Sequence, residues 1–190
     1  MKSILAGISL VCSVLLFGQQ SVRVYTLAEL SQANPDSVFS IDLSREKLTA
    51  IPPIVYRFTQ IKTINLSKNK IEFLGDSILV FRHLETLNLT KNKLQSIPFS
   101  LFQLSSLTHL ILAENNIEKI PNEIGQLMQL ELLDLYDNAV TDISPNLKSL
   151  PHLKRLDIQG VMYSHAFHMQ LVNDFKHCKL LLDPPCSCMD

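Results

Sequence analysis

The chain has 190 residues, a net charge of −1, a pI near 6.6 and 46% hydrophobic residues. This nearly neutral balance argues against a nucleic-acid-binding protein, because such proteins carry a surplus of lysine and arginine. The length fits one folded domain behind a short leader, and we see no linker or low-complexity tract.

Residues 1–20 predict a secretory signal peptide. Lys2 is followed by an apolar run from Ile4 to Phe17 and then by Gly18, near which we expect cleavage. The run is too short to cross a bilayer comfortably, since a spanning helix needs roughly 20 residues, and no later segment approaches that length. We therefore expect an exported protein (periplasmic, cell-surface or secreted) without a membrane span in the mature chain. Lipidation at Cys12 and an uncleaved anchor are the alternatives.

Residues 21–37 are predicted to form an N-terminal cap. The stretch from Thr26 to Glu29 fits a capping box, which opens a short helix at about Leu27 to Gln32. Such a lid would keep water off the first repeat.

A repeat of 23 residues fills residues 38–163 and makes about six coils. Four segments, which start at Ile61, Leu84, Leu107 and Leu130, read apolar-x-x-apolar-x-Leu-x-x-Asn without insertion or deletion. No single coil can shield so many apolar side chains, so the coils must stack into a solenoid with one continuous core. The alternating stretch of each coil predicts a short strand, and successive strands should form one parallel sheet.

An asparagine follows each central strand, at Asn69, Asn92, Asn115 and Asn138. An amide donates and accepts hydrogen bonds at once, so we expect these side chains to satisfy backbone groups of their own coil and the neighbouring one. Ile-Pro steps then direct the chain to the outer side, where short helical or 3-10 pieces such as Asn122 to Leu127 are expected.

These repeats resemble the leucine-rich repeat family in its 23-residue form. The stretch from Ile120 to Leu127 is similar to the outer segment common in bacterial members. The resemblance implies an α/β fold, namely a curved, horseshoe-like solenoid with a concave parallel β-sheet and short helical or 3-10 outer segments. It implies no particular ligand.

Residues 164–190 are predicted to form a C-terminal cap of a helix, a strand and a tail. The helix should span about His165 to Lys176 and the strand Cys178 to Leu182. One helix face carries the apolar residues Phe167, Leu171, Val172 and Phe175.

Three cysteines remain once the leader is removed, namely Cys178, Cys186 and Cys188. Three thiols cannot all pair within one chain. A bridge from Cys178 to either of the others would fasten the tail to the cap, and unpaired thiols are the alternative.

The open strand positions between the buried leucines predict where a ligand binds. Most are small and polar, but four residues on adjacent coils break this rule: His109, Ile111, Leu132 and Tyr136. Exposed aliphatic side chains beside a tyrosine and a histidine, with a polar rim, are typical of an interaction anchor. Scattered surface residues without a role are the alternative.

A charge gradient is predicted along neighbouring outward-facing strand positions. Lys68 and Lys91 make the first half positive, whereas Glu114, Asp134 and Asp137 make the second half negative. Neighbouring strands lie about 4.8 Å apart, so like charges stack and could orient a charged partner. A merely solubilising turn sequence is the alternative.

Catalytic motifs are missing from the sequence. Beyond the leader it has three glycines, and it carries no H-E-x-x-H, G-x-S-x-G or C-x-x-C spacing. His165 and His168 lie one helical turn apart and could hold a metal, but no carboxylate or thiol at fixed spacing completes the set. We expect no cofactor and no enzyme activity.

The sequence thus predicts a non-catalytic binding module that recognises a protein, or a glycan, through the concave sheet. A structural or adhesive component of the cell envelope is one alternative. A small metal-dependent hydrolase that uses the C-terminal cap is another.

Overall fold

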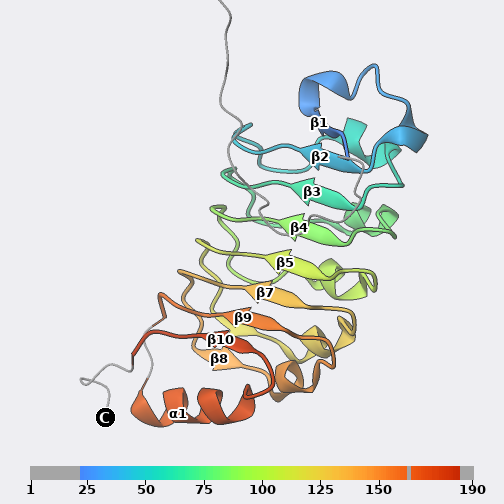
Figure 1. The fold of residues 1–190 in the computed structure, drawn as a ribbon. Coiled ribbons are helices and arrows are strands. Elements are labelled where there is room, and N and C mark those ends of the chain that lie inside the picture. Colours follow the sequence, from blue (N-terminus) through green and yellow to red (C-terminus); the bar gives the residue numbers. More distant parts are fainter. Residues whose placement is uncertain (1–21, 162–163, 185–190) are drawn as a thin grey trace, which may run out of the picture.

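The computed structural model describes residues 22–161 and 164–184, whose coils stack in one row from the N-terminal cap to helix α1 (Figure 1). The predicted signal peptide and the tail residues Cys186 and Cys188 lie outside the described residues. Their cleavage and pairing stay predictions.

A parallel sheet runs the length of the stack, as the repeat predicted. Within the described residues it has eight strands in the order β1-β2-β3-β4-β5-β7-β9-β10. Ile64 of β3 is the register partner of Leu87 of β4, so the register between these coils equals the sequence period. The strands are β1 (Val24–Thr26), β2 (Ser40–Asp42), β3 (Thr63–Asn65), β4 (Thr86–Asn88), β5 (His109–Ile111), β7 (Leu132–Asp134), β9 (Arg155–Asp157) and β10 (Lys179–Leu181).

The outer side of the stack carries one 3-10 turn per coil. Proline stands immediately before or at the start of most of these turns, where its fixed φ suits the first turn of a helix. The predicted piece from Asn122 is present as η6. The turns are η3 (Pro53–Arg57), η4 (Asp76–Val80), η5 (Phe99–Gln103), η6 (Asn122–Gln126) and η7 (Pro145–Ser149).

A second pairing on the outer side escaped the sequence analysis. Strand β6 (Lys119–Ile120) pairs with β8 (Asp142–Ile143) in parallel. Two residues per strand give no alternating pattern from which a strand could be predicted.

The predicted apolar columns form one continuous core. In the eight-stranded sheet, the middle residue of each strand from β2 to β9 is fully buried, and each such side chain stabilises the stack by roughly 1.5–3 kcal/mol. Leu48, Leu74 and Ile143 are only partly buried, although they still pack against the core.

The asparagine column has the predicted structural role. Asn92 Nδ2 donates to the carbonyl oxygen of Leu66 in the preceding coil, at 3.0 Å, and to Leu89 in its own coil, at 2.9 Å. Its Oδ1 accepts the backbone N–H of Ile71 at 3.0 Å. The same three bonds recur at Asn69, Asn115 and Asn138.

The helix of the N-terminal cap is shorter than predicted. The capping box is confirmed, since Glu29 Oε2 accepts the backbone N–H of Thr26 at 2.8 Å. However, it opens only one 3-10 turn, η1 (Leu27–Glu29), and a second turn, η2 (Pro35–Ser37), follows. The cap also adds β1, which the sequence analysis missed.

At the C-terminal end, helix α1 (His165–Asp174) closes the stack and β10 follows it. The helix stops before Lys176, because Phe175 leaves the helical conformation with φ −111° and ψ 31°. Leu171 and Phe175 are buried and Phe167 packs against the core, as predicted. Val172 does not share this face and is 39% exposed.

Candidate functional site

The predicted anchor residues lie together on the open face of the sheet. His109 and Leu132 are register partners on β5 and β7, and so are Ile111 and Asp134. The residues between them, Leu110 and Leu133, are buried, so alternation along each strand directs the other four side chains away from the core. We call His109, Ile111, Leu132, Asp134 and Tyr136 the concave patch.

Tyr136 is held in the concave patch by a turn that Asp134 stabilises. Asp134 Oδ1 accepts the backbone N–H of Tyr136 at 3.0 Å, and the tyrosine is 46% exposed. The same bond spans two residues after four other strands. Asp134 therefore has a structural role in addition to any role in binding, and an asparagine would preserve it.

Ile111 breaks this column of turn-forming side chains. Across the described strands β2 to β9 the position reads Asp42, Asn65, Asn88, Ile111, Asp134 and Asp157. An isoleucine has no acceptor, so this coil forgoes a hydrogen bond worth about 0.5–1.5 kcal/mol and presents an aliphatic side chain instead. The substitution is visible in the sequence once the column is recognised as a turn motif, which the sequence analysis missed.

The ring of His109 has a defined hydrogen-bonding pattern. Thr108 Oγ1 donates to the carbonyl oxygen of Glu85 at 2.9 Å, which uses its one proton. His109 Nδ1 lies 2.8 Å from the same Oγ1, so Nδ1 must be the donor of that contact. In the neutral ring Nε2 is then an acceptor.

Asp134 is the electrostatically unusual member of the patch. Burial raises the pKa of its carboxyl group, and the neighbouring Asp157 raises it further. The N–H of Tyr136 and the charge of Arg155 oppose this shift without cancelling it. Arg155 is itself held by Asp157, with Nη2 to Oδ2 at 3.2 Å.

Of the predicted charged residues, only Asp134 lies on a strand, at the end of β7, which corrects that part of the prediction. Lys68, Lys91, Glu114 and Asp137 lie in the bends after the strands, each with a positive φ between 53° and 59°. Each directly precedes a residue of the asparagine column. A residue in the left-handed conformation at this position turns the chain so that the following amide side chain points inward.

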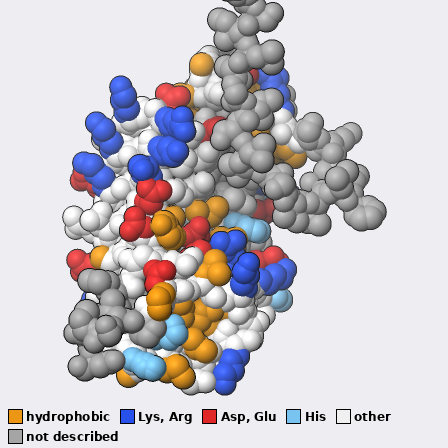
Figure 2. All heavy atoms as spheres, turned by 60° about the vertical axis from the view of Figure 1, so that its left-hand side comes forward, with side chains coloured by type: hydrophobic (Ala, Val, Ile, Leu, Met, Phe, Trp, Pro, Cys, Tyr) orange, Lys and Arg blue, Asp and Glu red, His pale blue; other side chains and the backbone are white. Residues whose placement is uncertain are grey.

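The predicted gradient of charge follows these bends. On the face shown in Figure 2, lysine and arginine side chains gather along the upper left edge, and acidic side chains follow directly below them. The two signs meet where Lys91 Nζ pairs with Glu114 Oε2 at 2.9 Å. This contact raises the pKa of Lys91.

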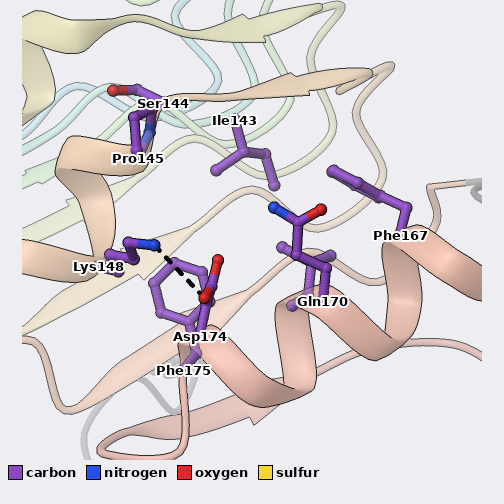
Figure 3. Close-up of a pocket in the computed structure, with 9 residues that line it drawn as sticks. Ile143, Ser144, Pro145, Lys148, Phe167, Gln170, Asp174 and Phe175 are labelled. Atoms are coloured by element: carbon purple, nitrogen blue, oxygen red, sulfur yellow. Dashed lines mark hydrogen bonds and ion pairs between the residues drawn. The ribbon is translucent and has the colours of Figure 1, made fainter.

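A pocket of about 250 Å³ lies between α1 and the coil formed by residues 130–152 (Figure 3). Ile143 and Pro145 line it from the coil, and Phe167 and Phe175 from the cap. The ion pair between Lys148 and Asp174, at 3.5 Å, closes one side. This pocket was not predictable from the sequence, because its walls come from two separate segments of the chain, residues 143–148 and 167–175.

The cap hypothesis of a metal site gains no support from the geometry. Within residues 22–161 and 164–184, no group of three or more histidine, cysteine, aspartate or glutamate side chains is placed to hold a metal ion. In the same part of the chain, no helix has the length and apolar character needed to cross a bilayer.

The comparisons with known proteins agree with this architecture. A family model described as a leucine-rich repeat region matches residues 42–181. A solved leucine-rich repeat protein from Leptospira interrogans is 26% identical with a TM-score of 0.64, and the match covers 76% of this chain and 36% of that protein. An internalin from Listeria monocytogenes is 19% identical with a TM-score of 0.64. This match covers 81% of this chain and 47% of the internalin chain. The chain thus spans less than half of either structure, and a comparison with curated proteins finds no match.

Proposed function

The chain belongs to the leucine-rich repeat family, and from this premise we propose that it is a non-catalytic module that binds a protein partner through the concave patch. The observation that carries the proposal is the aliphatic side chain of Ile111 in a column otherwise made of aspartate and asparagine. The coil gives up a stabilising turn bond there, and binding is the compensating gain.

The neighbours of Ile111 support an anchor of mixed chemistry. Leu132 adds a second partly exposed aliphatic side chain, and Tyr136 adds an aromatic ring that is 46% exposed. In its neutral form, the ring of His109 offers an acceptor at Nε2. Aromatic and aliphatic anchors with a few polar groups at the rim are typical of binding hot spots.

We further propose that the protein works outside the cytoplasm. The support is the leader-like sequence of residues 1–20. Periplasmic, cell-surface and secreted locations all agree with it.

A pull-down experiment tests the proposed binding face. The full chain and a Leu132→Asp, Tyr136→Ala double variant are used as bait in extracts of the source cell envelope and of its surroundings. The matched control is Thr63→Asp, Ser67→Ala, which changes the same two columns three coils earlier. We expect the control to retain the partner and the patch variant to lose it. Capture of the same partner by the patch variant would contradict the proposal.

A further inference from the structure

The cations that border the concave patch already have acidic partners. Arg155 is paired with Asp157 at 3.2 Å, and Lys154 with Glu131 at 2.8 Å. Lys62 and Glu85 form a similar pair, at 2.8 Å, three coils before Glu131 and Lys154. In each of these ion pairs the positive charge is already neutralised within the chain, so it does not need a charged group from a partner.

Asp134 differs from these residues. Its described contact is the hydrogen bond from the backbone of Tyr136, and no cation of residues 22–161 and 164–184 forms an ion pair with it. Its carboxylate lies directly beside Ile111 in the register of the sheet. A partner that covers Ile111 must therefore also strip water from this carboxylate.

Removing that water is costly unless the partner supplies a compensating charge or donor. The chemistry of the partner is thereby constrained. An apolar or acidic group over Asp134 would oppose docking, whereas a guanidinium or ammonium group would favour it.

The wider charge distribution favours the same kind of partner. Residues 107–152, the two coils that carry the patch, contain seven acidic residues and two basic ones, a net charge of −5. Residues 38–106, the three coils before them, contain nine basic residues and five acidic ones, a net charge of +4. A basic segment is attracted to the patch and repelled from the earlier coils.

We infer that the partner protein inserts an arginine or lysine side chain against Asp134 while an adjacent apolar side chain of the same segment packs on Ile111 and Leu132. This inference rests on the proposed function and specifies the chemistry of its partner. The groups that face Asp134 are Ile111 from β5, Arg155 and Asp157 from β9, and Tyr136 from its own coil. Arg155 keeps its ion pair with Asp157, so the carboxylate of Asp134 is available to bind the partner's cation.

A peptide-display selection tests this inference. A random twelve-residue peptide library is selected in parallel on the full wild-type chain, on Asp134→Asn and on the Leu132→Asp, Tyr136→Ala variant. Asparagine preserves the acceptor for the N–H of Tyr136, so the turn remains intact while the charge is removed. The selected peptides are then synthesised, and their affinities are measured at low and high salt.

We expect wild-type selections to enrich arginine or lysine next to an aliphatic or aromatic residue, with at least about tenfold weaker binding to Asp134→Asn. High salt should weaken binding to the wild-type chain more than binding to the variant. Peptides that bind the patch without basic residues, or that bind Asp134→Asn equally well, would overturn the inference but leave the proposed function standing. Peptides that bind the Leu132→Asp, Tyr136→Ala variant as well as wild type would overturn the proposed function itself.

A second copy of the chain is the competing occupant, because its basic coils could meet the acidic ones. Analytical ultracentrifugation of the chain alone distinguishes the two. A monomer supports a separate partner. A dimer that Asp134→Asn dissociates would overturn the inference and assign the patch to self-association.

Discussion

Ile111 of β5 and Asp134 of β7 are register partners. Ile111 is the one aliphatic residue among the equivalent positions from Asp42 to Asp157, and it lies beside a carboxyl group whose pKa is raised by burial. The repeat elsewhere places turn-forming asparagine or aspartate at this position. We propose that this local break in a structural rule marks a position that serves binding more than stability.

The cost of that break can be measured with Ile111→Asn. Asparagine restores an acceptor for the turn, so we expect the free energy of unfolding to rise by about 1 kcal/mol. Urea denaturation measures the change, with Ile111→Val as a control that keeps the aliphatic character. The same variant should lose partner capture. A destabilised Ile111→Asn would show that the isoleucine is there for packing.

The hydrogen bonds of the asparagine column predict a large loss of stability when Asn115 is replaced. Asn115→Ala removes bonds to the carbonyl oxygens of Leu89 and Leu112 and leaves the backbone N–H of Leu94 without its acceptor. We expect unfolding to cost about 3 kcal/mol less, because several buried backbone groups lose partners together. Asn116→Ala, at the exposed neighbour, should change stability by less than about 0.5 kcal/mol. Equal effects of the two variants would contradict the structural role.

Asp134 predicts a pH-dependent difference in stability. A carboxyl group with a raised pKa in the folded state disfavours folding once it ionises, so the stability it provides below its unfolded pKa is lost as pH rises through the folded pKa. Asp134→Asn removes this loss. We therefore expect the variant to be more stable than wild type at pH 7, and we expect the difference to shrink as pH falls through the folded pKa and to vanish below about 4, near the unfolded pKa. A difference that grows toward low pH would show that the pKa shift has the opposite sign.

Gly160 occupies the position equivalent to Asp137 in the next coil, and its close backbone contact predicts a steric effect of substitution. Its φ is +82°, and a Cβ built there would lie 2.7 Å from the Cα of Asp137. Gly160→Ala should destabilise the chain by about 1–3 kcal/mol, because the backbone of a neighbouring coil would have to move. Gly75→Ala is the matched control, since its added Cβ meets no described heavy atom within 4 Å. Similar melting temperatures for the two variants would contradict the close approach.

The sheet, the core and the asparagine column were predictable because each recurs with the period of the repeat. A residue such as Leu110 is then constrained by several equivalent positions at once. The ends of the chain lack this redundancy, so Val172 was placed on the wrong side of α1 and β1 was missed.

The site was predictable only in part. His109, Ile111, Leu132 and Tyr136 stand out because they depart from their columns. The bends that hold Lys68 and Asp137 were mistaken for strand positions, because side-chain alternation does not reveal a positive φ. The contact between Thr108 and His109 depends on rotamers, which no periodic pattern encodes.

Hydroxyl-radical footprinting of the complex with the captured partner tests the central claim most directly. The method reports the solvent exposure of individual oxidisable side chains, and mass spectrometry locates the modified residues. We predict that binding protects His109, Leu132 and Tyr136 while Phe99, which is 61% exposed on the outer turn η5, stays as reactive as in the free chain. Protection of Phe99 with an unchanged Tyr136 would place the interface on the outer side and contradict the account.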